Sequence, residues 1–171
     1  SAVLTALEDF KKKASANSVW NIEWDLENFH YCDAHGVTCG ICPNEDLNCK
    51  AKEKVTKLSI SYNGLAGEFS AFELSTFKDT LVELTLAGNS LTGGIPSSLF
   101  TLNKLTSLSL FYNSLSGNLP DAIGSLTNLI ELDLDQNVFT GPIPDSFSKL
   151  TKLTKLDLGN NRITGEIPKG L

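Results

Sequence analysis

The chain has 171 residues, of which 41% are hydrophobic and 20% charged, proportions typical of a globular domain with a sizeable core. Its net charge is −6, and residues 1–54 and 55–171 both carry an acidic excess, so no basic stripe indicates nucleic-acid binding. No apolar run approaches the ~20 residues that a membrane span needs, and no segment has the pattern of a signal peptide.

Residues 2–14 predict an amphipathic helix. Its apolar residues fall on one face at the spacing of a helical turn: Val3, Leu4, Leu7 and Phe10. Residues 15–54 lack such periodicity. Residues 1–54 are therefore expected to form a cap that covers the apolar end of the segment that follows.

The cysteines lie close together, at Cys32, Cys39, Cys42 and Cys49. An even, local cluster in a chain with no other cysteine indicates disulfides and an oxidising compartment. Three pairings are possible, and the symmetric spacing favours Cys32–Cys39 with Cys42–Cys49. The alternative is a zinc site, in which His30 and His35 join two of the cysteines as ligands.

One unit of sequence recurs from residue 55 to the end of the chain. Its clearest copy is LTSLSLFYNSLSGNLP at residues 105–120, and the other copies begin at residues 55, 81, 129 and 153. The asparagines that mark the unit are separated by 26, 24, 24 and 24 residues: Asn63, Asn89, Asn113, Asn137 and Asn161. This nearly constant period predicts a solenoid built by stacking one supersecondary unit.

Each unit begins with the pattern of a short strand. Leu108 and Leu110 alternate with polar neighbours, which indicates a strand with one buried face. Asn113 follows, and its amide can satisfy backbone groups of the adjacent turn. The repeated asparagine therefore predicts a ladder of hydrogen bonds through the stack.

After the asparagine the chain is expected to turn away from the strand. Gly117 permits a tight backbone path and Pro120 prevents continuation as a helix. The apolar residues that follow are spaced by three and predict a 3₁₀-like turn on the outer side: Ile123, Leu126 and Leu129.

The unit LxxLxLxxNxLxGxIP resembles the plant-type leucine-rich repeat of receptor-kinase ectodomains and polygalacturonase-inhibiting proteins. The segment CDAHGVTC at residues 32–39 is similar to that family's cap motif CxWxGVxC, with Ala34 in place of tryptophan. The resemblance implies an α/β repeat solenoid, a right-handed superhelix with short parallel strands on its concave face and a helical, disulfide-stapled N-terminal cap. It also implies a secreted or extracellular protein, or the ectodomain of a membrane protein.

Five repeats occupy residues 55–171, and no C-terminal cap follows the last, incomplete one. Its apolar side chains are expected to lack a covering repeat: Leu156, Leu158, Ile163 and Ile167. Each partly exposed aliphatic side chain forfeits up to ~1.5–3 kcal/mol of burial. We expect the chain to be a piece of a longer protein, or this end to meet a partner.

The outward positions of the strands are expected to line the concave face. The candidate partner-binding residues on it are Tyr62, Phe111, Tyr112, Glu131, Asp133, Asp135 and Asp157. Phe111 and Tyr112 are large apolar groups beside an acidic cluster. Such an arrangement suits a protein or peptide ligand that carries Lys or Arg.

Catalysis is a weaker hypothesis for the same residues. Asp133 and Asp135 stand at i and i+2, which could suit a glycosidase pair. They are expected on an open surface, however, and no His or Cys nucleophile set lies near them in the sequence. We therefore predict no enzyme activity, no cofactor and no metal site for the repeats.

A ladder of hydroxyl groups raises ice binding as another alternative. Thr92, Ser116, Thr140 and Thr164 occupy one slot at 24-residue spacing, although Ala66 interrupts the series. The same slot is commonly Thr or Ser in the family that the chain resembles, so a structural role is favoured.

The predicted function is an extracellular protein- or peptide-binding module that acts through its concave face, without inserting into a membrane. One alternative is an inhibitor of a cell-wall-degrading enzyme. The other is a structural or assembly component that makes its contact through the open C-terminal end.

Overall fold

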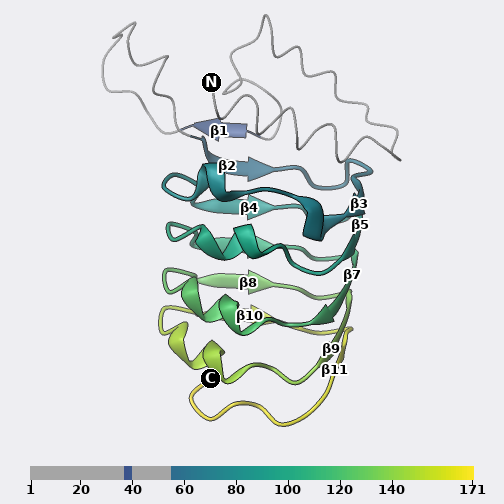
Figure 1. Ribbon diagram of the computed structural model, residues 1–171, viewed down its shortest axis with the longest axis vertical. Helices are drawn as coiled ribbons and strands as arrows, with labels where there is room; N and C mark the ends of the chain where they lie inside the picture. Colours follow the sequence, from purple (N-terminus) through teal and green to yellow (C-terminus); the bar gives the residue numbers. More distant parts are fainter. Residues whose placement is uncertain (1–36, 40–54) are drawn as a thin grey trace, which may run out of the picture.

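The computed structural model of the protein describes residues 37–39 and 55–171. Over residues 55–171 the chain coils so that each turn stacks on the preceding one along a single axis (Figure 1). The solenoid predicted from the 24-residue period is confirmed.

The first sheet runs the length of this stack, with strand order β1-β2-β4-β6-β8-β10. Its strands are β1 (Val37–Cys39), β2 (Val55–Ser59), β4 (Glu83–Thr85), β6 (Ser107–Ser109), β8 (Glu131–Asp133) and β10 (Lys155–Asp157). The strands from β2 onward pair in parallel, as predicted, whereas β1 pairs antiparallel with β2. The central leucines Leu84, Leu108 and Leu132 stand in register and are buried.

A second parallel sheet was not predicted from the sequence. Its order is β11-β9-β7-β5-β3, with strands β3 (Ala66–Glu68), β5 (Ser90–Gly93), β7 (Ser114–Asn118), β9 (Val138–Gly141) and β11 (Arg162–Ile163). These strands follow the asparagine of each repeat. Leu91, Leu115 and Phe139 point inward from them and are fully buried, so the second sheet closes another side of the same core.

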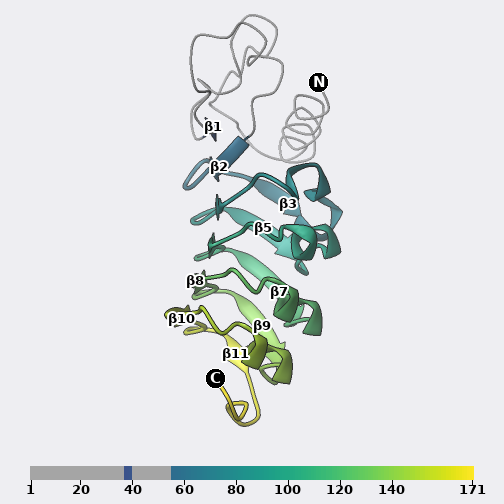
Figure 2. The same cartoon turned by 90° about the vertical axis from the view of Figure 1, so that its left-hand side faces the viewer.

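Short 3₁₀ segments complete the first four turns on the side away from the first sheet (Figure 2), as the three-residue spacing predicted. They are η3 (Phe69–Ala71), η4 (Ser75–Phe77), η5 (Ser97–Thr101), η6 (Asp121–Ser125) and η7 (Asp145–Lys149). The proline before each of the last three is in extended conformation and begins the turn.

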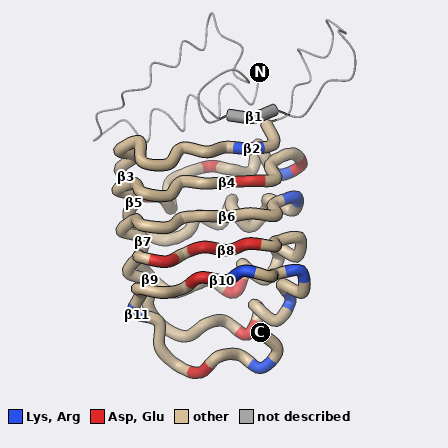
Figure 3. The backbone as a smooth tube through the Cα atoms, turned by 180° about the vertical axis from the view of Figure 1, so that it is seen from behind, with Lys and Arg blue, Asp and Glu red and all other residues tan. Residues whose placement is uncertain are grey.

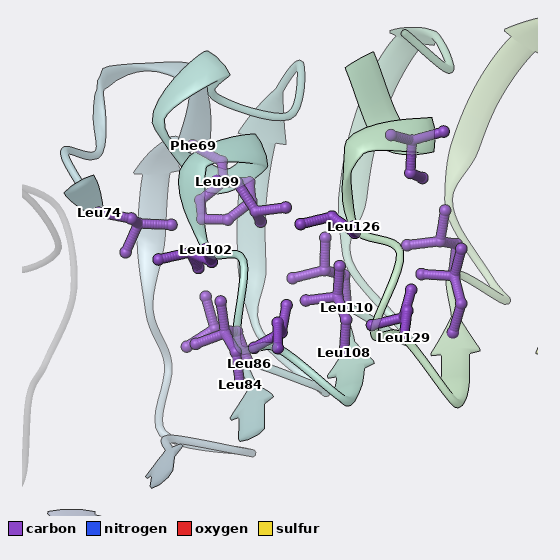
Figure 4. Packing of buried hydrophobic residues seen from close by; sticks show 14 of the residues in the cluster. Phe69, Leu74, Leu84, Leu86, Leu99, Leu102, Leu108, Leu110, Leu126 and Leu129 are labelled. Atoms are coloured by element: carbon purple, nitrogen blue, oxygen red, sulfur yellow. The ribbon is translucent and has the colours of Figure 1, made fainter. Parts of the chain in front are cut away.

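One continuous apolar core fills the space between these layers (Figure 4). The third repeat, for example, contributes Leu108 from β6, Leu110 just after that strand, and Leu126 at the end of η6. A fully buried side chain of this kind contributes ~1.5–3 kcal/mol relative to an exposed one. Most of that burial depends on the neighbouring repeats, because each turn covers the apolar edge of the next.

The asparagine ladder is present as predicted. The Oδ1 atom of Asn137 accepts the Leu115 N–H of the preceding repeat at 3.0 Å. Its Nδ2 group donates to the carbonyl oxygen of Leu110 in the preceding repeat at 3.0 Å and to that of Leu134 in its own repeat at 3.2 Å. Asn89, Asn113 and Asn161 make the equivalent contacts.

The last repeat is less well covered than the internal ones. Leu156, Leu158 and Ile163 are half-buried, whereas their counterparts one repeat earlier are fully buried. Ile167 is 73% exposed and Leu171 49% exposed. A hollow of about 490 Å³ lies at this end, between η7, β10 and the last residues.

Several sequence predictions fall outside the described residues. They are the helix at residues 2–14, the cap as a whole, and the disulfide or zinc site of Cys32, Cys42 and Cys49. Cys39 lies in β1, but its side chain is not among the described features. Within the described ranges, no helix is long and apolar enough to cross a membrane.

We expect Asn137→Ala to lower the free energy of unfolding by at least about 2 kcal/mol, because it leaves buried backbone groups on two repeats without partners. Denaturant titration measures the change. Asn103→Ala is the matched control, since Asn103 is exposed and its side chain makes no hydrogen bond in the described structure. Equal unfolding midpoints for the two variants would contradict a stabilising role for the ladder.

Candidate functional site

The solvent side of the first sheet, here called the concave face, is a grid of side chains. Parallel pairing aligns the same position of every repeat, and the ladder of N–H···O=C bonds continues past the strand ends. The aligned rows are Lys57, Glu83, Ser107, Glu131 and Lys155; Ser59, Thr85, Ser109, Asp133 and Asp157; Ser61, Ala87, Phe111, Asp135 and Gly159; and Tyr62, Gly88, Tyr112, Gln136 and Asn160. Neighbouring rungs are ~4.8 Å apart.

Acidic residues gather on the β8 and β10 side of this face, whereas β6 carries none (Figure 3). Asp133 and Asp157 are direct neighbours across the two strands. An Asp133 carboxylate oxygen also accepts the Asp135 N–H at 3.1 Å, which holds the side chain against the turn that follows β8.

Two carboxylates converge over Gly159. A Cβ atom added to Gly159 would lie 2.9 Å from Oδ1 of Asp135 and 3.1 Å from Oδ1 of Asp157. The Gly159 N–H donates to Asp157 at 2.9 Å, and the Asn160 side-chain amide donates to Asp135 at 2.8 Å. We call this arrangement of Asp135, Asp157 and Gly159 the Gly159 notch.

The acidic residues of this region form no ion pair with a described residue, although Lys155 of β10 lies beside Glu131 of β8. In the part of the chain that the structure describes, an ion pair of the concave face joins Lys57 of β2 to Glu83 of β4 at 2.6 Å. None of the carboxylates on β8, β10 and the turns after them has a basic partner among the described residues: Glu131, Asp133, Asp135 and Asp157. Lys155 is the one basic residue of β8 and β10, so a cationic group brought to Asp133, Asp135 and Asp157 would meet an excess of negative charge.

Phe111 and Tyr112 lie next to the acidic cluster. Phe111 precedes Asp135 in the same row, and its ring centroid is 5.9 Å from that of Tyr112, with the planes tilted by 36°. Phe111 is half-buried, so it projects less than the sequence predicted, whereas Tyr112 is 56% exposed. The two rings together form an apolar patch on an otherwise polar face.

Tyr62 stands apart from this group. It occupies the slot of Tyr112 two rungs toward β2, and its side chain is 68% exposed. Its ring lies over Gly88, because a Cβ atom added to Gly88 would come within 2.3 Å of the ring atoms Cδ1 and Cε1. Gly88 therefore makes room for Tyr62.

The structure thus brings six of the seven predicted surface residues into one region and leaves Tyr62 two rungs away. The sequence reasoning passed over Gly159, Gly88 and Asn160, which shape this region from positions without large side chains. The available signal was the change of residue at an aligned slot: glycine stands at 159 where Phe111 and Asp135 stand in earlier repeats.

The hydroxyl series of the ice-binding alternative is not a continuous ladder in the second sheet. That sheet pairs residues 22 apart along most of its length, so Thr92 lies beside Ser114, Ser116 beside Val138, and Thr140 beside Arg162. An aliphatic and a charged side chain therefore interrupt the hydroxyls. Nor do the described residues contain a group of three His, Cys, Asp or Glu that could hold a metal ion.

The family profile "Leucine rich repeat" matches residues 117–163, and a second profile of that description matches residues 80–102 and 104–126. The structure is similar to the ectodomain of the receptor kinase SOBIR1 from Arabidopsis thaliana, with a TM-score of 0.79, 28% identity, and coverage of 99% of this chain and 85% of that one. A chain of the BIR3–SERK2 complex from the same plant is 31% identical, with a TM-score of 0.76 and coverage of 100% and 87%.

The chain belongs to the plant-type leucine-rich-repeat family. The SOBIR1 neighbour is the leucine-rich-repeat ectodomain of a receptor kinase. A third neighbour, the ectodomain of GASSHO1/SCHENGEN3 from Arabidopsis thaliana, was solved in complex with CASPARIAN STRIP INTEGRITY FACTOR 2; its TM-score is 0.79 at 32% identity, over 96% of this chain and 19% of that one. No curated protein matches the chain by sequence.

We expect Gly88→Ala to displace the Tyr62 ring, because the new methyl group would occupy the ring's position. The left-handed φ of +66° at this residue should also cost about 1–2 kcal/mol of unfolding free energy. NMR signals of the Tyr62 ring and denaturant titration measure the two effects.

Gly94→Ala is the control for this substitution, since the nearest atom to its added Cβ is 3.9 Å away. If the Tyr62 ring signals of Gly88→Ala matched those of the unchanged protein, the packing of the ring on Gly88 would be refuted.

Proposed function

We propose that this protein is an extracellular, non-enzymatic module that binds a protein or peptide through its concave face. The observation that carries the proposal is the placement of Phe111 and Tyr112 beside carboxylates that form no ion pair with the described residues. An exposed aromatic group supplies apolar contact area, and the adjacent charge selects the partner. The residues proposed to bind are Tyr62, Phe111, Tyr112, Glu131, Asp133, Asp135 and Asp157.

The geometry suits a Lys or Arg side chain of the partner. Its aliphatic stem would pack on Phe111, and its charged end would reach Asp135 and Asp157 over the bare backbone of Gly159. An Arg fork can donate to both carboxylates at once, whereas Lys offers one compact charge. We therefore expect Arg to be preferred.

The family supports a role in recognition. SERK2 and BIR3 were solved as a complex, and GASSHO1/SCHENGEN3 was solved with CASPARIAN STRIP INTEGRITY FACTOR 2. In the second case the partner is in complex with a leucine-rich-repeat ectodomain. Because the present chain spans only 19% of the second receptor, the ligand of that receptor is not carried over.

An inhibitor of a cell-wall-degrading enzyme would use the same kind of surface. The two functions differ in the partner, since an inhibitor needs a folded enzyme and a receptor-type module can bind a free peptide. Binding of a short synthetic peptide at the Gly159 notch would favour the peptide-binding function.

We expect peptides selected from a random display library on the full chain to be enriched in Arg and Lys. The enrichment should disappear with Asp135→Asn, which keeps the side-chain shape and its hydrogen bond to Asn160 possible but removes the charge. Phe111→Ala should weaken the selected peptides about tenfold, the effect of losing one anchor of ~1.4 kcal/mol.

Glu68→Gln is the matched control, because Glu68 lies on β3 of the second sheet. Selection of the same peptides by the unchanged protein and by the Asp135→Asn and Phe111→Ala variants would remove the concave face as the binding surface.

Binding of the selected peptides should also weaken as sodium chloride is raised from 50 to 500 mM, since the attraction between exposed charges is screened over ~10 Å at 0.1 M salt and over less at higher salt. Fluorescence anisotropy measures the affinity. For a peptide whose Arg is replaced by Gln, we expect little dependence on salt. An affinity that does not change with salt would contradict recognition by the carboxylates.

A further inference from the structure

The turn of the first repeat differs from the other four turns at the residue that follows the ladder asparagine. This residue is Gly64, which is left-handed with a φ of 67°. In the later repeats the residue at this slot has no positive φ and begins a strand of the second sheet: Ser90, Ser114, Val138 and Arg162. Because β3 begins only at Ala66, Gly64 lies outside both sheets.

The left-handed turn leaves the main-chain nitrogen of Gly64 unoccupied. Its N–H group has no acceptor among the described residues, and the residue is exposed. At the same slot of the next repeat, the Ser90 N–H donates to the carbonyl oxygen of Leu65 at 2.6 Å. The first repeat therefore has a main-chain nitrogen that is both exposed and free to react.

The side chain of Asn63, next to this nitrogen, is the most weakly held of the ladder. Its Nδ2 group donates to the carbonyl oxygen of Ser61 at 2.7 Å, and its Oδ1 atom has no partner in the described structure. The Asn113 side chain, by contrast, accepts the Leu91 N–H at 3.1 Å and donates to three main-chain carbonyl oxygens. One hydrogen bond thus restrains the amide of Asn63, whereas four restrain that of Asn113.

The order of the two residues matters for their chemistry. An asparagine amide can be attacked by the main-chain nitrogen of the residue that follows it. Glycine favours this attack, because it has no Cβ atom to hinder the approach and it adopts backbone angles closed to other residues. The sequence contains an asparagine followed by glycine once, at Asn63-Gly64. The dipeptide and the unoccupied nitrogen therefore coincide at one turn.

We propose that Asn63-Gly64 is a self-modification site, at which Asn63 converts to aspartate and isoaspartate without an enzyme. The Gly64 nitrogen gives up its proton and bonds to Cγ of Asn63, while the bond from Cγ to Nδ2 breaks. The departing nitrogen takes the proton and leaves as ammonia, so that a five-membered succinimide remains. Water then opens the ring at either carbonyl group. No oxidant or reductant is needed, and the inference does not depend on the proposed function.

The isoaspartate product cannot keep the present turn. Its main chain runs through the former side chain, which adds one atom to the link between residues 63 and 64. The N–H groups of Asn63 and Leu65, on the two sides of that link, both donate to Oδ1 of Asn89, at 3.1 and 3.0 Å. Lengthening the link separates these two donors. We therefore expect the modification to displace Tyr62, which directly precedes the turn.

The aspartate product disturbs the turn in another way. A carboxylate oxygen takes the place of the Nδ2 group, which donates to the carbonyl oxygen of Ser61. Two acceptors then face each other without a hydrogen between them. Either product changes the edge of the concave face that carries Tyr62, so this edge is expected to change as the protein ages.

Incubation of the folded full chain, followed by peptide mass spectrometry, tests the inference. The measured quantity is the rate at which unmodified Asn63 is lost, in mildly alkaline and in mildly acidic buffer. A protein isoaspartate methyltransferase, which methylates isoaspartate and not aspartate, distinguishes the two products. Ser114→Gly is the matched control, because it places a glycine after Asn113, and Ser114 is exposed.

In the folded state we expect Asn63 to be lost at least about tenfold faster than Asn113 of the Ser114→Gly variant. Each additional hydrogen bond that must open lowers the reactive fraction by up to about tenfold. In concentrated urea the two asparagines should react at similar rates, since both are then followed by glycine in an open chain. The loss should be slower in acidic buffer, because the attacking nitrogen must give up its proton. The NMR signals of the Tyr62 ring should shift in the modified fraction.

Two results would overturn the inference. One is that Asn63 persists in the folded protein but is lost in urea, because the fold would then protect the site. The other is an equal rate in the folded state for Asn63 and for Asn113 of Ser114→Gly. Thermal melting shows whether Ser114→Gly is folded. If it is not, Ser90→Gly replaces it, since the Asn89 side chain accepts two N–H groups and donates to three carbonyl oxygens.

Discussion

The contact between successive turns through the asparagine ladder is the constraint on which the rest of the structure depends. In each repeat the chain must leave the first sheet and enter the second within a few residues, and that turn buries backbone groups that no strand partner can satisfy. One asparagine amide satisfies them on its own repeat and on its neighbour, as the contacts of Asn137 with Leu110, Leu115 and Leu134 illustrate. The side chain therefore defines both the turn and the stacking of one turn on the next.

The same turn produces the surface that we propose to be functional. In all five repeats the residue before the asparagine has a left-handed backbone conformation. Its side chain therefore lies at the edge of the concave face. The repeat dictates the backbone at this slot and leaves the side chain free to vary. Tyr62 and Tyr112 occupy it in two repeats, and Gly88 between them leaves room for a ring. A uniform scaffold thus displays a surface that differs from rung to rung.

The candidate site was largely visible in the sequence once the repeat was aligned. The strand period and the 24-residue spacing placed Phe111, Tyr112 and the acidic residues in neighbouring rows, and the structure has them there. Three features could not be read in that way. The half-burial of Phe111, the position of the Tyr62 ring over Gly88, and the convergence of Asp135 and Asp157 over Gly159 depend on side-chain directions, which a sequence period does not specify.

By itself the sequence determined the solenoid, the first parallel sheet, the asparagine ladder and the 3₁₀ side, because each follows from a local pattern repeated with a constant period. The second sheet was decided only by the tertiary structure. Its strands are short, and Leu115 is flanked by two serines with weak strand preference, so pairing arises from the stacking of whole turns. From β5 onward the strands of that sheet pair residues 22 apart, whereas the first sheet pairs residues 24 apart from β4 onward, and this difference has the same origin. It separates Thr92, Ser116 and Thr140 in space although the sequence aligns them.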